Sequence, residues 1–361
     1  MDILKLWFAL VEISSNIKLK ILTEFGSLEN IRDFMTMHKS STALDNKLID
    51  KLIKAYDLQK LYRIMEKLEK EQIGFITIKE GQYPEKLKLF DDAPFALFYK
   101  GNISNINQER SISIVGSRTC TRYGADITKL ITEELVQNNL NIISGMARGI
   151  DTIVHKTAVI NKGYTVAILG SGVDVVYPKE NLKLYNEIIS SGGCVISEFA
   201  PETRPLSMNF PIRNRIISGL SDLVIVAEAG EKSGSLITAT KALEQGKEVM
   251  AIPGSIFSEE SKGTNKLIKE GAHVFTNIND VFYLLGIDRN KNNKIINDNN
   301  KGSVCEDIYR IIDNNPIHID DIIRLTNIDI KQIYELLFEM QLKDEILCLN
   351  GSFYVRVNKI I

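Results

Sequence analysis

The chain has 361 residues, which predicts two or three domains rather than one. Hydrophobic residues make up 44%, charged residues 25%, and the formal net charge is −2, so the composition is globular and excludes a uniformly basic, histone-like DNA binder. The four cysteines and four histidines show neither C-x-x-C nor H-x-x-x-H spacing, which predicts a cytoplasmic protein with reduced thiols and no metal site.

Residues 1–75 have helical periodicity. Leu4, Trp7 and Phe8 share one face of a first amphipathic helix, and Gly26-Ser27 marks a helix end followed by a new helix cap. The first residues lack the features of a signal peptide, and no apolar run reaches the roughly 18 residues of a membrane span, so we expect no membrane anchor. Residues 83–101, which contain two prolines, are predicted to form an extended connector packed on the next domain.

From Ser111 onward, the chain repeats a pattern of apolar strand, glycine turn and helix. The predicted strands are Ser111–Val115, Asn141–Ile143, Thr165–Leu169, Cys194–Ile196, Leu223–Ala227 and Glu248–Ile252. Alternating strands and helices predict an α/β domain over residues 76–288, with a doubly wound, mostly parallel, Rossmann-like sheet. The glycine turns then lie at the carboxyl ends of the strands, where such sheets bind ligands.

Two of these turns predict phosphate binding. Ser233-Gly234-Ser235 stands immediately before a helix, and Gly116-Ser117-Arg118 follows the first strand of the repeat. Backbone N–H groups at a helix start, serine hydroxyls and a guanidinium are all suited to an anion. The sequence therefore predicts a phosphate site built from these two turns.

Basic residues recur at the strand ends. They are Arg118, Arg122, Arg148, Lys179, Lys183, Arg213, Arg215, Lys262 and Lys266. Most carboxylates fall elsewhere, so we expect one basic face, too long for a single small ligand. For Arg213 and Arg215 a second interpretation stays open, in which they form structural ion pairs with Glu198 or Glu228.

Other site chemistries find less support. No G-x-G-x-x-G motif follows the first strand of the repeat and no acidic residue follows the second, so no dinucleotide cofactor is expected. Asp151 and His155 lie one helical turn apart and could form an acid–base pair, but an Asp that caps a helix beside a packed His is the commoner arrangement.

The C-terminal part begins with an Asn/Lys-rich linker over residues 289–302. Residues 303–361 then show helical patterns at 304–313, 318–325 and 330–342, followed by two strand-like segments around Asn350-Gly351, which predicts a winged helix. Residues 302–361 carry six Lys/Arg against ten Asp/Glu. This acidic balance favours a protein-contact module over a duplex-DNA reader.

Several motifs, in order, resemble the DNA-processing protein A (DprA/Smf) family over about residues 75–285. They are GSRxxxxYG, SGxAxGIDxxxH, AILGSGVDxxYPxxN, FPxRNRIISGLS, EAxxxSGSLITA and PGSxxxxxSxGxNxLIxxGA. The resemblance implies single-stranded DNA binding, delivery of that DNA to RecA in natural transformation and recombination, and a homodimer; single-stranded-DNA-binding protein is a further partner it admits.

Carried over by position, the resemblance implies DNA contacts from Arg118, Lys179, Arg213, Arg215 and the Ser233-Gly234-Ser235 turn; Gly116, Ser117 and Arg148 complete our predicted site. The N-terminal helices would form a SAM or helix-hairpin-helix-like domain. Residues 14–18, however, lack the glycine that such a hairpin often contains, which puts DNA binding there in doubt.

The same sheet plan is also similar to nucleoside-monophosphate phosphoribohydrolases, which carry a PGGxGTxxE loop. Aligned on the glycine, Thr238 occupies the position of their catalytic glutamate. Threonine does not act as a general base near neutral pH without a partner. We therefore expect a binding protein rather than an enzyme, with the hydrolase as the alternative.

Overall fold

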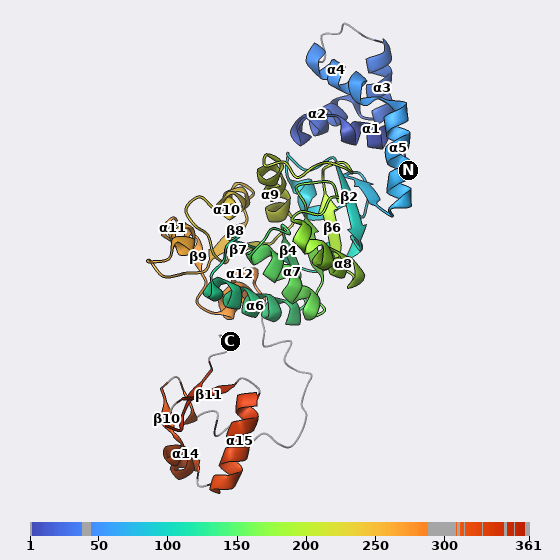
Figure 1. Ribbon diagram of the computed structural model, residues 1–361. Coiled ribbons are helices and arrows are strands. Elements are labelled where there is room, and N and C mark those ends of the chain that lie inside the picture. The colour runs from blue at the N-terminus through green and yellow to red at the C-terminus, as the bar shows by residue number, and fades with distance from the viewer. Residues whose placement is uncertain are drawn as a thin grey trace. The chain divides into compact units, whose positions relative to one another are not determined.

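The computed structural model describes residues 2–37 and 45–287 and, further on, 308, 311–313, 315–326, 328–342, 345–349 and 351–357. The chain forms two compact units, Met1–Thr276 and Asn277–Ile361 (Figure 1). The predicted linker, residues 289–302, lies outside the described residues.

The first unit begins with helices, as predicted. They are α1 (Ile3–Leu10), α2 (Ser15–Phe25), α3 (Leu28–Met37), α4 (Asn46–Ala55) and α5 (Leu58–Lys70). Gly26 ends α2 with φ of 74°, a conformation that favours glycine. The helices share a core with the sheet: the Phe8 ring meets that of Phe95, with centroids 4.9 Å apart.

A nine-stranded sheet follows, and it confirms the predicted α/β class. Its strands are β1 (Gly74–Thr77), β2 (Ala96–Gly101), β3 (Ser111–Val115), β4 (Asn141–Ser144), β5 (Thr165–Ile168), β6 (Cys194–Ser197), β7 (Leu223–Val226), β8 (Glu248–Ala251) and β9 (His273–Val274). Their spatial order is β1-β2-β6-β5-β4-β3-β7-β8-β9. All pairs from β6 to β9 in that order are parallel.

The prediction of an extended connector over residues 83–101 is wrong in part. This stretch forms the short helix η1 (Glu85–Leu89) and then β2, which pairs antiparallel with β6 on one side and with β1 on the other. Leu97 and Phe98 are buried, because β2 is covered on both faces.

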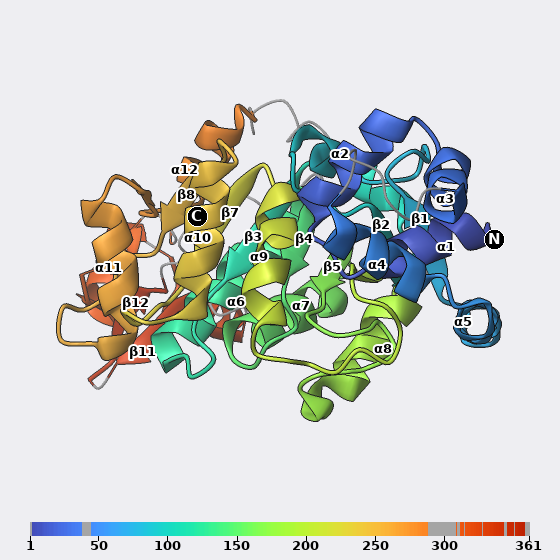
Figure 2. The ribbon, with the colours of Figure 1, turned by 90° about the horizontal axis from the view of Figure 1, so that it is seen from above.

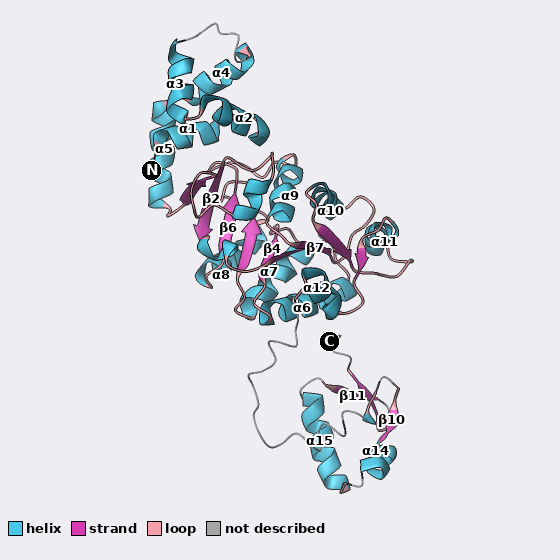
Figure 3. Ribbon diagram, turned by 180° about the vertical axis from the view of Figure 1, so that it is seen from behind, coloured by secondary structure: helices cyan, strands magenta, loops and turns pink. Residues whose placement is uncertain are grey.

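Helices cover both faces of the sheet. They are α6 (Arg122–Gln137), α7 (Ile150–Ile160), α8 (Leu182–Ser190), α9 (Asn209–Gly219), α10 (Gly234–Glu244) and α11 (Lys262–Lys269). The first three pack together on one face, and α9, α10 and α11 lie on the other (Figures 2 and 3). This double covering buries the parallel strands.

The second unit contains α12 (Ile278–Leu285) and a winged helix. The latter comprises β10 (Ile317–His318), α14 (Ile319–Thr326), α15 (Ile330–Leu342), β11 (Ile346–Leu349) and β12 (Phe353–Arg356). The predicted hairpin is present as β11 and β12, and β10 adds a third strand to it. The helix predicted at 304–313 falls largely outside the described residues.

Within the described part of the chain, no helix combines the length and the apolar character needed to cross a membrane.

Candidate nucleic-acid interface

The order of the strands creates a switch point between β3 and β7. From β3 the chain runs outward through β4, β5 and β6, and then returns to place β7 on the other side of β3. Loops after strands on either side of such a point diverge, which leaves a crevice at the carboxyl edge of the sheet. The predicted Gly116-Ser117-Arg118 and Ser233-Gly234-Ser235 turns follow these two strands.

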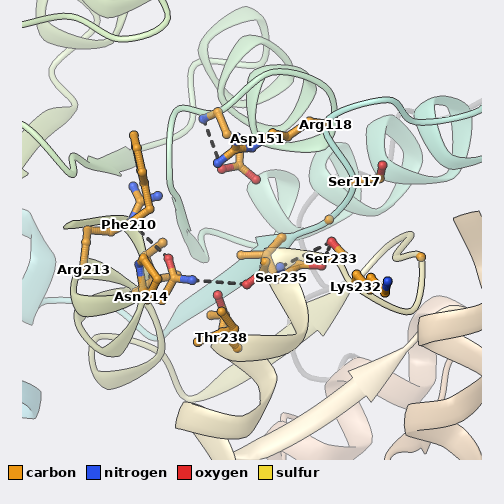
Figure 4. Close-up of a pocket in the computed structure, with 18 of the residues that line it drawn as sticks. Ser117, Arg118, Asp151, Phe210, Arg213, Asn214, Lys232, Ser233, Ser235 and Thr238 are labelled. Carbon is orange, nitrogen blue, oxygen red and sulfur yellow. Dashed lines mark hydrogen bonds between the residues drawn. The ribbon is translucent and has the colours of Figure 1, made fainter. Parts of the chain in front are cut away.

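A pocket of about 670 Å³ occupies this crevice (Figure 4). Its lining includes Gly116, Ser117, Arg118, Asp151, Tyr177, Phe210, Arg213, Asn214, Lys232, Ser233, Gly234, Ser235, Thr238 and Glu260. The two predicted turns therefore meet in one pocket, as the strand pattern indicated.

The turn after β3 is fixed by the backbone around it. Ser117 N donates to Glu228 O at 2.7 Å, and Ile150 N donates to Ser117 O at 3.1 Å. Gly149 has φ of 69°, and a Cβ there would lie 2.3 Å from Ser117 O. Glycine at this position thus allows the β4–α7 connection to approach the turn and hold Arg118 at the pocket.

The Ser233-Gly234-Ser235 turn opens helix α10. Ser233 is its N-cap, and its hydroxyl accepts from Ser235 N at 3.4 Å and lies 2.8 Å from the Ser235 hydroxyl. On the other side, Asn214 Nδ2 donates to Gly234 O at 3.3 Å. The positive end of the α10 dipole and two hydroxyls therefore face the pocket, an arrangement suited to an anion.

Phe210 forms an aromatic wall between two arginines. The guanidinium carbons of Arg118 and Arg213 lie 5.6 Å and 5.9 Å from its ring centroid, and the Tyr177 ring lies 5.7 Å away. Arg118 is exposed, and among the described residues no carboxylate forms an ion pair with it. Its charge is therefore available to a ligand.

Arg213 also lines the pocket, but its side chain is buried rather than exposed. It is only 4% exposed, and its guanidinium donates to the carbonyls of Gly145, at 2.7 Å, and of Ile168. Burial lowers the pKa of Arg213 to about 10, partly offset by the nearby Asp151 carboxylate. A Cβ on Gly145 would lie 2.8 Å from both groups, so this glycine leaves room for them.

The structure does not bring Arg215 to the pocket. Arg215 is buried, pairs with Glu198 at 2.6 Å and Asp92 at 3.6 Å, and donates to the Ser15 hydroxyl of α2 at 3.1 Å. Of the two interpretations left open by the sequence, structural ion pairing describes Arg215, with Glu198 as its partner. Glu228 instead accepts from the amide and hydroxyl of Thr121.

The remaining predicted residues lie at the rim or beyond it. Arg148 lines a smaller neighbouring pocket together with Arg118 and Tyr177, but is paired with Glu180. Lys179 is exposed, lines neither pocket and has no ion-pair partner in the described part of the chain. Nearby carboxylates also pair with Arg122, Lys183, Lys262 and Lys266. The expected basic face is thus partly neutralised, both by neighbours on the same helices and by carboxylates from other loops.

Sequence reasoning missed Lys232 and Asn214 as pocket residues. Lys232 precedes the Ser233-Gly234-Ser235 turn, and its position beside that turn was an available signal. Asn214 stands between the two arginines that drew attention first. Glu260, which also lines the pocket, could not be assigned from its place in the sequence.

Asp151, which lines the pocket, and His155 are both buried. Asp151 accepts from Ala147 N at 3.2 Å, and burial raises its pKa while the positive charge of Arg213 opposes that effect. His155 Nδ1 lies 2.8 Å from the Thr165 hydroxyl, and burial lowers the pKa of His155 to about 3. The histidine is therefore a neutral, packed side chain near pH 7.

This burial predicts acid sensitivity. Because the pKa of His155 is about 3 when folded and about 6.5 when unfolded, the unfolded chain takes up the proton first as pH falls. The stability that a neutral His155 contributes is complete above pH 6.5 and declines toward pH 3. At pH 5 the loss is about 2 kcal/mol. Urea denaturation at pH 7.5 and pH 5 measures it, and His155→Asn should remove this part of the pH dependence. An unchanged dependence in the variant contradicts the assignment.

In the described part of the chain, no group of three or more His, Cys, Asp or Glu side chains could hold a metal ion.

The fold and pocket define a Rossmann-like protein with a crevice at its switch point, lined by two glycine-serine turns and basic side chains, and with a winged helix in its second unit. Family models match residues 74–286 as DNA recombination-mediator protein A and residues 303–352 as the DprA winged helix domain. The chain therefore belongs to the DprA/Smf family of DNA-processing proteins.

Individual relatives agree with this assignment. DNA processing protein DprA of Bacillus subtilis is 43% identical over 223 residues, covering 62% of this chain and 75% of the relative. Protein Smf of Escherichia coli is 42% identical over 209 residues, which cover 58% of this chain and 56% of the relative.

Two solved structures are similar. DprA of Streptococcus pneumoniae matches with a TM-score of 0.67 and 36% identity, covering 78% of this chain and 98% of that one. DprA of Helicobacter pylori, solved to describe its single-stranded DNA binding mode, matches with a TM-score of 0.53 and 30% identity, covering 58% and 95%.

Proposed function

We propose that this protein binds single-stranded DNA through the switch-point pocket. The observation that carries the proposal is that Arg118, which no described carboxylate pairs with, meets Lys232 and the Ser233-Gly234-Ser235 helix start in one pocket. Phosphates of the strand contact these groups, and the Phe210 ring beside them offers a face to a base. The single-stranded DNA binding mode of the Helicobacter pylori relative supports the choice of ligand.

Delivery of the strand to RecA, in the cytoplasm and by a homodimer, is the finer proposal. It is supported by the family description, a DNA recombination mediator. A RecA ATPase assay on strands coated with single-stranded-DNA-binding protein tests it: adding the chain should shorten the lag before RecA becomes active.

We further propose that the pocket binds without breaking bonds. Thr238, at the position of the hydrolase glutamate, and Asp151 both line the pocket, but their side chains are almost fully buried. Threonine does not act as a general base near neutral pH without a partner, and the Asp151 carboxylate already accepts from Ala147 N and lies beside the positive charge of Arg213. Incubation with nucleoside monophosphates should release no free base; release that requires Asp151 or Thr238 would establish the hydrolase instead.

Arg118→Ala tests the DNA site directly. Loss of one charge-assisted phosphate contact should weaken binding of a (dT)20 strand by about tenfold. It should also reduce the slope of log affinity against log salt by about 0.7, since that slope counts phosphate contacts. Fluorescence anisotropy at several salt concentrations measures both quantities.

Arg63→Ala is the matched control for this experiment. Arg63 is an exposed arginine of α5 that pairs with Glu202 at 3.2 Å and does not line the pocket. It should leave both affinity and slope unchanged. Equal behaviour of the two variants, or salt-independent binding by the unaltered chain, would refute the proposed site.

A further inference from the structure

A second cavity, of about 550 Å³, opens at the same carboxyl edge. Its lining residues are Thr121, Tyr123, Glu228, Pro253, Gly254, Ser255, Ser258 and Ser261. It adjoins the main pocket: Thr119 and Glu260 line that pocket and are hydrogen-bonded at 3.3 Å, and the neighbouring Thr121 and Ser261 line the cavity. One wall of loops therefore separates two hollows on a continuous edge.

The loop after β8 holds exposed apolar side chains beside this cavity. Between Ser255 and Ser258, which line it, Phe257 is 90% exposed and Ile256 is 77% exposed. Such exposure of adjacent large apolar residues is costly in a free protein and is typical of binding surfaces. Tyr123, half exposed, forms part of the cavity wall.

The loop that carries them is firmly held. Asn265 accepts from Gly254 N at 3.2 Å and donates to Gly254 O at 2.9 Å, so one amide clamps both backbone groups. The Tyr123 hydroxyl donates to Pro253 O at 2.9 Å, and Phe257 N donates to the Ser255 hydroxyl at 3.3 Å. The loop is therefore anchored where it leaves β8, and Ser258 N donates to Ser255 O at 3.0 Å, which closes a turn around the aromatic tip.

The charge around this cavity disfavours a second phosphate site. Among the described residues that line it none is Lys or Arg, while the carboxylate of Glu228 does line it. Carboxylates repel phosphate, whereas a nucleobase is uncharged and stacks on an aromatic face. The main pocket differs in that its lining includes Arg118, Arg213 and Lys232 beside Asp151 and Glu260.

We propose that this cavity and the Phe257 tip, together with Tyr123, form a base-binding platform for the strand whose phosphates lie in the main pocket. The inference rests on the proposed function and names the part of the ligand that this edge recognises. Stacking accepts every base, so the platform adds affinity without sequence preference and adds nothing to the salt dependence.

Phe257→Ala tests the platform with two strands of equal charge, (dT)20 and a 20-nucleotide abasic strand, by fluorescence anisotropy on the full chain. The variant should bind (dT)20 about tenfold more weakly, and the abasic strand as the unaltered chain does. The salt slope should not change, and Phe257→Trp should retain full affinity. Tyr283→Ala, which removes an 85% exposed aromatic of α12, is the control and should match the unaltered chain.

The outcomes separate the two proposals. If the unaltered chain binds neither strand, the proposed function fails and this inference fails with it. If it binds (dT)20 normally and Phe257→Ala does too, only the platform is overturned. If the variant weakens both strands equally and sedimentation shows altered self-association, the tip is a contact between protein copies, and the platform is again overturned.

Discussion

Replacement of Arg215 by alanine is expected to lower the free energy of unfolding by about 3–5 kcal/mol, because it leaves a buried carboxylate without its partner. The Glu198 side chain is 12% exposed and lies near Arg215 of α9 and Lys18 of α2. Burial raises the pKa of Glu198, and the charges of Arg215 and Lys18 oppose that effect. With Arg215 absent, only Lys18 remains to offset a charge removed from water. Urea denaturation measures the loss.

Two comparisons make this prediction specific. Arg63→Ala breaks an exposed ion pair between the same helical region and the sheet domain, and should cost no more than about 1 kcal/mol. Arg215→Met combined with Glu198→Leu removes both charges and should recover most of the loss, as apolar replacements of buried pairs often do. If the Arg215→Ala variant is as stable as the unaltered chain, the ion pair between Arg215 and Glu198 does not stabilise the fold as proposed.

The Arg215→Ala variant should keep the salt slope of DNA binding of the unaltered chain, since Arg215 does not line the pocket. A fall of about 0.7, equal to that expected for Arg118, would show that Arg215 contacts phosphate after all.

Replacement of Arg213 by alanine is expected to damage stability and binding together. Its guanidinium bonds the carbonyls of Gly145 and Ile168 and is the positive neighbour of the buried Asp151. Without it, Asp151 is a buried charge with no opposing cation, so about 3–5 kcal/mol of stability should be lost. Binding of (dT)20 should weaken at least as much as in Arg118→Ala, since the Phe210 wall loses its support.

The pH dependence identifies Asp151 as the cause. Without Arg213, the pKa of Asp151 in the folded state rises further above its unfolded value, so protonation favours the folded form as pH falls. The loss of unfolding free energy caused by Arg213→Ala should therefore be smaller at pH 5 than at pH 8, as measured by urea denaturation. Arg213→Ala with Asp151→Asn should show no such narrowing. A deficit that is equal at both pH values would assign the loss to the carbonyl contacts alone.

The contrast between these two arginines shows where sequence reasoning reaches its limit. The strand and glycine-turn pattern correctly indicated the parallel sheet and both pocket turns, because local spacing alone encodes them. Arg213 and Arg215 were grouped because they are close in sequence. They lie instead within helix α9, where residues two apart face different directions, so one reaches the pocket and the other the helical region.

The features that the sequence did not predict depend on contacts between residues far apart in the chain. Arg148 meets Glu180 and Thr119 meets Glu260 only because the loops of different strands converge. The β1–β2 pair was missed for the same reason: β2 becomes a strand through its antiparallel partner β6, which lies far along the chain. Neither the Arg148–Glu180 pair nor this edge of the sheet has a local signature.

The switch point has a consequence for synthesis on the ribosome. Strand β3 pairs with β4 soon after both emerge, but its other edge waits for β7, from Leu223 onward. Until then a nascent chain presents an apolar strand edge, a template for aggregation. A truncated product ending before β7 would keep that edge permanently and lack half of the pocket. Ribosomes stalled within this interval should therefore yield chains that need a chaperone and cannot bind DNA.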